Sequence, residues 1–88
     1  MRLIFFSKAW EEYLFWQGED QAVLQRVNAL IKECMRTPFS GLGKPEPLKN
    51  ELKGWWSRRL TIEDRLIYRV SGQRGEQTLE ILQCRYHY

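Results

Sequence analysis

Residues 65–70, Arg65-Leu66-Ile67-Tyr68-Arg69-Val70, decide the fold because two kinds of side chain alternate along them. Successive side chains of a β-strand point to opposite faces of the sheet. One face of this run therefore carries Leu66, Tyr68 and Val70. The other face carries Arg65, Ile67 and Arg69. The pattern predicts a strand that packs one face on a core and presents basic groups on the other.

Two further strand-like runs lie on either side of this one in the sequence, from Leu52 to Leu60 and from Thr78 to Tyr88. Turn-forming segments separate the three runs, from Thr61 to Glu63 and from Ser71 to Glu76. Strand-like runs joined by short turns of this composition are typical of antiparallel sheets.

The register of the first two of these strands follows from matching their apolar faces. Trp56 and Leu60 belong with the buried face, so Arg59 is expected opposite or diagonal to Arg65 on the other face. Like charges so placed destabilise a sheet. Water can solvate them, or an anion can join them. Arg58 is expected on the core side unless a bulge turns it outward.

The last run presents two unlike faces. One face carries Leu82, Cys84, Tyr86 and Tyr88. The other carries Leu79, Ile81, Gln83, Arg85 and His87. Because this second face begins apolar and ends polar, we expect it to form one wall of a cleft. His87 and Tyr88 alternate, so both can line one site only if the chain bends at its last residue.

The N-terminal half predicts one short strand, Arg2 to Phe6, and two helices. Ser7 is expected to cap a first helix that ends at Gly18, with the apolar residues Ala9, Trp10, Tyr13, Leu14 and Trp16 at helical spacing. Asp20 is expected to cap a second helix that stops at Thr37-Pro38, with an apolar stripe of Val23, Val27, Leu30, Ile31 and Cys34. The two helices should form an αα-hairpin.

Length and composition indicate one small domain, residues 1–88, with a net charge of +3. Cys34 and Cys84 lack the spacing of metal ligands, and one histidine cannot complete a common zinc set. We therefore expect no metal site, and buried, reduced thiols in a cytosolic protein. The apolar start of the chain breaks at Ser7-Lys8, too early for a signal peptide or a membrane span.

Two ionisable residues stand out as candidates for chemistry. Glu46 lies between Pro45 and Pro47, whose fixed φ angles stiffen the loop. His87 is the only histidine in the chain, next to the end, and histidine can exchange a proton near neutral pH. A solvated glutamate on a rigid turn and an exposed strand histidine are the plain alternatives. With the arginines, however, the two supply what metal-free RNA cleavage needs, namely a base, an acid and cations.

Four segments together resemble the Txe/YoeB toxins of the RelE-like superfamily of ribosome-dependent mRNA interferases. They are Gly43-Lys44-Pro45-Glu46-Pro47-Leu48-Lys49, Trp56-Ser57-Arg58-Arg59-Leu60, Arg65-Leu66-Ile67-Tyr68 and Cys84-Arg85-Tyr86-His87-Tyr88. The resemblance implies a compact α/β (α+β) RelE-like fold, with two N-terminal helices on a twisted, largely antiparallel sheet of four to five strands. It also implies a cytoplasmic toxin that cleaves mRNA in the ribosomal A site, needs no cofactor or membrane, is neutralised by a YefM-like antitoxin and commonly forms a homodimer.

The same resemblance implies a role for each matching residue. Glu46 matches the family's general base and His87 its general acid. Arg65 matches the residue that stabilises the transition state, and Tyr88 the terminal tyrosine that orients the scissile phosphate. Lys49 and Arg59 match supporting, substrate-binding basic residues.

Two binding functions remain as alternatives to catalysis. A non-catalytic ParE-like toxin shares the superfamily fold and binds a protein target. A basic RNA-binding module would act through phosphate contacts alone. Substitution of His87 separates them from a nuclease, because binding would survive the change and cleavage would not.

Overall fold

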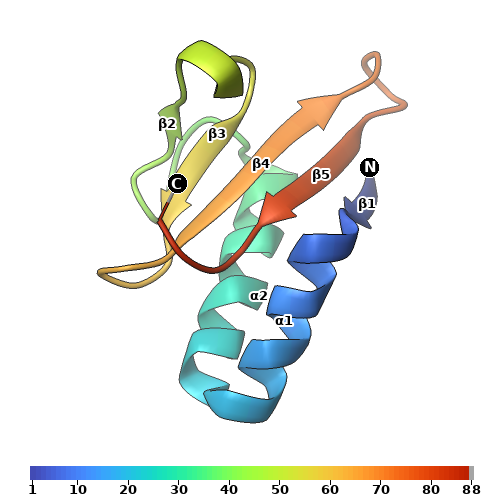
Figure 1. Ribbon diagram of the computed structural model, residues 1–88. Helices are drawn as coiled ribbons and strands as arrows, with labels where there is room; N and C mark the ends of the chain where they lie inside the picture. Colours follow the sequence, from blue (N-terminus) through green and yellow to red (C-terminus); the bar gives the residue numbers. More distant parts are fainter. Residues whose placement is uncertain (88) are drawn as a thin grey trace.

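The alternating run at residues 65–70 lies in the central strand of a five-stranded sheet with the order β1-β5-β4-β3-β2. The computed structural model describes residues 1–87. Its strands are β1 (Arg2–Phe5), β2 (Glu46–Pro47), β3 (Trp56–Arg59), β4 (Arg65–Ser71) and β5 (Thr78–Gln83). Three neighbouring pairs are antiparallel, and β1 pairs with β5 in parallel. Helices α1 (Ser7–Glu19) and α2 (Gln21–Arg36) form a hairpin on one side of this sheet (Figure 1). The predicted fold class is confirmed.

The main core lies between the helices and the sheet. Sheet residues of the predicted buried face, among them Leu66 and Tyr68, pack there against α2. The predicted stripe of α2 supplies Val27, Leu30, Ile31 and Cys34, with Val23 at its margin. A smaller apolar cluster consists of Leu48 just after β2, Trp55 just before β3, and Ile67 on β4. Full burial of one such aliphatic side chain contributes roughly 1.5–3 kcal/mol.

The two cysteines are buried free thiols, as predicted. Burial raises the pKa of Cys34 to about 11 and that of Cys84 to about 12. Neither thiol is therefore a thiolate near neutral pH. No helix among the described residues has the length and apolar character needed to cross a membrane.

The predicted ends of the helices are partly confirmed. The Asp20 side chain caps α2 by accepting the N–H groups of Ala22 and Val23. Helix α2 ends at Arg36 with Thr37 as its C-cap, as the Thr37-Pro38 pair predicts. The cap predicted for α1 is wrong, because Ser7 is already helical and Phe6 occupies the N-cap without a side-chain bond. Gly18 also lies inside α1, which continues to Glu19.

The predicted buried face of α1 is too broad. Ala9 and Trp16 are buried, whereas Trp10 is 47% exposed and Leu14 is 44% exposed. Adjacent helical positions point about 100° apart, so Trp10 cannot share the face of Ala9. The inward position between Ala9 and Trp16 is occupied by Glu12, which the apolar pattern did not indicate.

The strands predicted from Leu52 to Leu60 and from Thr78 to Tyr88 are shorter than their sequence runs suggested. Residues Asn50–Leu52 form a 3₁₀ turn, and β3 begins at Trp56. Strand β5 ends at Gln83, so the predicted strand from Thr78 to Tyr88 is wrong beyond that residue.

A bulge in β5 also reverses the predicted faces of the last run. Ile67 pairs with Gln83 but Tyr68 pairs with Ile81, which leaves Leu82 as an extra residue. One extra residue shifts the alternation of all that follow. Ile81 and Cys84 therefore both lie in the main core, where alternation had placed them on opposite faces.

Arg58 lies on the core side of β3, as predicted, and is fully buried. Its guanidinium donates to the hydroxyl of Tyr68 at 3.1 Å and to the carbonyl of Leu42 at 2.7 Å. It also donates to the carbonyls of Thr37 and Ser40. This one side chain therefore ties the segment after α2 to the middle of the sheet.

We predict that Arg58→Met lowers the free energy of unfolding by about 3–5 kcal/mol, because it leaves the buried Tyr68 hydroxyl and three partly buried carbonyls without this donor. Urea denaturation measures the loss. Arg74→Met, at an exposed arginine in the turn after β4, should stay within about 0.5 kcal/mol of the parent. A similar small loss in both variants would contradict a structural role for Arg58.

Candidate functional site

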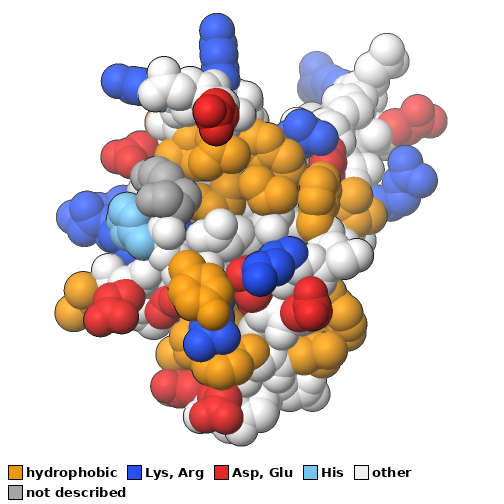
Figure 2. All heavy atoms as spheres, in the orientation of Figure 1, with side chains coloured by type: hydrophobic (Ala, Val, Ile, Leu, Met, Phe, Trp, Pro, Cys, Tyr) orange, Lys and Arg blue, Asp and Glu red, His pale blue; other side chains and the backbone are white. Residues whose placement is uncertain are grey.

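A cavity of about 240 Å³ lies where β2, β3, β4 and the C-terminal segment meet. It is lined by Lys44, Glu46, Ser57, Arg59, Arg65 and His87. Four of the residues singled out in the sequence thus come together here: Glu46, Arg59, Arg65 and His87. In Figure 2 the histidine, in pale blue, lies beside Lys and Arg side chains.

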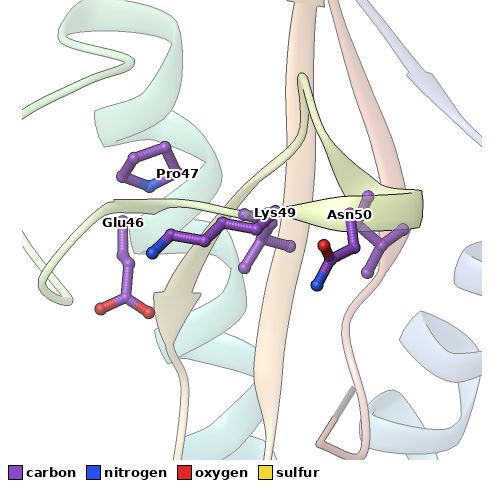
Figure 3. Close-up of a pocket in the computed structure, with 6 residues that line it drawn as sticks. Glu46, Pro47, Lys49 and Asn50 are labelled. Carbon is purple, nitrogen blue, oxygen red and sulfur yellow. The ribbon is translucent and has the colours of Figure 1, made fainter.

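Glu46 is positioned by strand pairing as well as by its two prolines. It lies on the edge strand β2, where its partner on β3 is Ser57. Pro47 can occupy this strand because it lies at the edge of the sheet. Figure 3 shows the side chains of Glu46 and Pro47 pointing in opposite directions. The segment predicted as a stiff loop is therefore partly a strand, which holds the exposed carboxylate at the cavity.

The turn before β2 brings the backbone very close to Arg58. Gly43 has a positive φ of 84°, and a Cβ there would lie 2.9 Å from Leu30 Cδ2 and 3.1 Å from Arg58 Cβ. Only glycine fits this conformation and this space. The Gly43 carbonyl accepts the Arg59 N–H at 2.7 Å. This close approach carries the following residue, Lys44, to the cavity.

Arg59 and Arg65 are direct cross-strand partners, which confirms the predicted pairing. Nη1 of Arg65 donates to the carbonyls of Thr61 at 2.9 Å, Ile62 at 3.3 Å and Asp64 at 2.9 Å. The turn between β3 and β4 therefore holds one side of this guanidinium. A second hollow of about 450 Å³, which includes Arg26, shares Arg59 and Arg65 with the cavity. Paired guanidinium groups of this kind favour an anion.

His87 reaches the cavity through a bend in the chain. Tyr86 has a positive φ of 69°. Its N–H donates to Asp64 Oδ1 at 2.6 Å, and its carbonyl accepts the Arg65 N–H at 2.9 Å. The chain thus turns at Tyr86, before the predicted position. Tyr88 lies outside the described residues, so its predicted place in the site is not described.

Lys49 lies in an adjacent hollow and not in the cavity itself. This hollow, of about 580 Å³, is lined by the segment from Glu46 to Asn50 and by Leu52. Figure 3 shows the Lys49 side chain running along β2 toward Glu46. Glu46 therefore borders both spaces, with Lys49 on one side and the arginine pair on the other.

Sequence reasoning missed two residues of the cavity, Lys44 and Ser57. Ser57 could have been found by alternation, because it stands two positions before Arg59 on the same strand. Lys44 lies before β2 with a positive φ of 54°, so strand alternation does not place it.

The cavity brings together groups suited to proton transfer next to an anion. A carboxylate and an imidazole can act as base and acid, and the cations can stabilise developing negative charge. Within residues 1–87, no group of three or more His, Cys, Asp or Glu side chains could hold a metal ion. These side chains are suited to acid–base chemistry on an anionic group.

The fold is that of the RelE-like toxins. A solved YoeB/ParE toxin from Agrobacterium tumefaciens matches with a TM-score of 0.98 and 52% identity over all of both chains. A YoeB dimer and a heterotetrameric YoeB–YefM toxin–antitoxin complex, both from Staphylococcus aureus, match with TM-scores of 0.88 and 0.87. Each is 36% identical and covers 100% of this chain and 98% of that one.

The chain belongs to the YoeB-like toxins of bacterial type II toxin–antitoxin systems, whose family model matches residues 5–88. Toxin YoeB of Escherichia coli K12 is 50% identical over 88 residues, which cover 100% of this chain and 100% of that toxin. The resemblance drawn from the four sequence segments is confirmed.

The arginine pair yields a stability prediction. Because Arg59 and Arg65 repel each other across β3 and β4, Arg59→Gln should raise the free energy of unfolding by roughly 0.2–1 kcal/mol at low salt. The gain should shrink at about 0.5 M salt, where screening is strong. Thermal unfolding at both salt concentrations measures it. Arg74→Gln removes the same charge away from the pair, and an equal gain in that variant would contradict the prediction.

Proposed function

We propose that this toxin is an endoribonuclease that cleaves mRNA in the ribosomal A site and so inhibits translation. The observation that carries the proposal is the convergence of Glu46, His87, Arg59 and Arg65 on one cavity from three strands and the chain end. These groups are distant in the sequence. Packing alone gives no reason for a carboxylate, the single histidine and two arginines to line the same space.

The proposed reaction uses the RNA's own hydroxyl as nucleophile. Glu46 accepts the proton of the 2′-hydroxyl, whose oxygen attacks the adjacent phosphorus. The bond from phosphorus to the 5′-oxygen breaks, and His87 donates a proton to that oxygen. Arg65 stabilises the negative charge of the phosphorane between these events. The products are a 2′,3′-cyclic phosphate and a 5′-hydroxyl, and the protein side chains supply every proton transfer without a metal.

The remaining candidate residues have supporting roles in this proposal. Arg59 pairs with the scissile or a neighbouring phosphate, since it faces the same cavity as Arg65. Lys49 binds the RNA backbone from the adjacent hollow that it shares with Glu46. Tyr88 orients the scissile phosphate, a role carried only by its match to the family's terminal tyrosine.

The proposed partners follow from the relatives. The Staphylococcus aureus relative forms a YoeB–YefM complex and a YoeB dimer. We propose a YefM-like antitoxin and a homodimer for this chain too, in the cytoplasm where the ribosome is its target. An acidic antitoxin segment that folds on binding would complement the cations of the cavity.

The test is cleavage of a defined mRNA on programmed ribosomes by purified variants. Glu46→Gln, Arg65→Met and His87→Gln should each slow cleavage by roughly 100-fold or more, because each removes a proton acceptor, a cation or a proton donor. The unfolding temperatures of Glu46→Gln and His87→Gln should stay close to that of the parent, whereas Arg65→Met also loses the hydrogen bonds to the turn between β3 and β4 and should unfold at a somewhat lower temperature. Glu76→Gln, at an exposed carboxylate in the turn before β5, should cleave normally.

Two outcomes would contradict the proposal. Normal cleavage by His87→Gln would remove the general acid from the mechanism. Arrest of translation without cut mRNA, by the parent protein, would favour a toxin that acts by binding alone.

A further inference from the structure

Helix α1 holds the backbone of Cys84 from both sides. Glu12 Oε1 accepts the Cys84 N–H at 2.8 Å, and Trp16 Nε1 donates to the Cys84 carbonyl at 2.7 Å. Residues four apart lie on the same helix face, so the two side chains act on one peptide segment together. The Cys84 thiol also approaches the Ala9 carbonyl, at 3.5 Å.

Cys84 is the first residue after β5, just where the sheet stops holding the chain. It is followed by Arg85, whose guanidinium lies 3.4 Å from the ring centroid of Phe15 on α1. Tyr86 is then held by Arg65, the first residue of β4, and by Asp64 just before it. The contacts with α1 therefore take over from strand pairing at Cys84 and Arg85, before the chain is held again at Tyr86.

Glu12 is a carboxylic acid buried at a position of α1 where an apolar side chain is expected. It is only 5% exposed, on the helix face that otherwise carries Ala9 and Trp16. Burial raises the pKa of its carboxyl, although the Cys84 N–H and the charge of Lys8 act in the opposite direction. An apolar residue would pack here without desolvating a carboxyl group. The acceptor for Cys84 is what Glu12 supplies and an apolar residue would not.

We propose that Glu12 is a positioning residue for His87, which fixes the C-terminal segment at Cys84 so that the imidazole reaches the cavity. Trp16 completes the clamp on the other side of the same residue. Glu12 does not line the cavity, so it acts through the backbone and not on the substrate. This inference rests on the proposed function, because it gives His87 a catalytic task, but the position of His87 can be measured without any cleavage.

The test compares Glu12→Gln with Glu12→Leu. The glutamine variant keeps an oxygen acceptor of the same length and should cleave within about threefold of the parent. The leucine variant keeps the volume but has no acceptor, and its maximal cleavage rate should fall about 10- to 100-fold, since about 1 Å of misplacement can have that effect. The KM should change little, because the cations that face the RNA lie on β3 and β4 and next to β2, and none lies on α1. Glu11→Leu, at the exposed neighbouring position, is the matched control and should cleave normally.

A second readout follows the imidazole itself. The chain has one histidine, so the imidazole signals in an NMR spectrum all belong to His87. They should move toward the values of an unfolded chain in Glu12→Leu and stay at the parent's position in Glu12→Gln and Glu11→Leu. Trp16→Phe removes the hydrogen bond to the Cys84 carbonyl and keeps an aromatic ring, so it should shift the same signals. This variant provides the test if Glu12→Leu fails to fold.

Unchanged histidine signals in a folded Glu12→Leu or in Trp16→Phe would overturn the inference, as would loss of cleavage in Glu12→Gln equal to that in Glu12→Leu. If the parent protein itself cleaves no RNA, the proposed function fails, and the NMR comparison still decides whether α1 positions His87.

Discussion

The hydrogen bonds of the buried Arg58 guanidinium are the constraint on which the site depends. They join the backbone after α2, at Thr37, Ser40 and Leu42, to Tyr68 on the central strand. Because the Arg58 side chain points into the core, alternation along β3 places Ser57 and Arg59 on the other face of the sheet, where both line the cavity.

The same constraint fixes the strand that carries Glu46. Gly43 packs against the Cβ atom of Arg58, and the Gly43 carbonyl accepts the Arg59 N–H. From that point the chain enters β2 and pairs with β3, with Glu46 beside Ser57. The proposed base and the arginine pair are thus set by one register, and that register follows from where Arg58 points.

Sequence patterns predicted the site best where the strands are regular. The alternation of β3 and β4 gave the Arg59–Arg65 pair and the inward Arg58, because neither strand contains a bulge between these residues. It failed at Leu82, since nothing in the residue type marks the extra position that reverses the faces of β5. The bend at Tyr86 could not be predicted from the sequence for a similar reason. A positive φ is uncommon outside glycine, and here it is imposed by bonds from β4 to residues distant in the sequence.

We propose that Glu46 activates a hydroxyl of the RNA and that the protein supplies no nucleophile of its own. The most direct measurement uses programmed ribosomes whose mRNA carries a single 2′-deoxy nucleotide at the cleavage position, with fragments analysed by mass. We expect no cleavage of this message. The unmodified message should yield one fragment with a 2′,3′-cyclic phosphate and one with a 5′-hydroxyl. Efficient cleavage of the 2′-deoxy message would contradict the proposal and require a site that activates water.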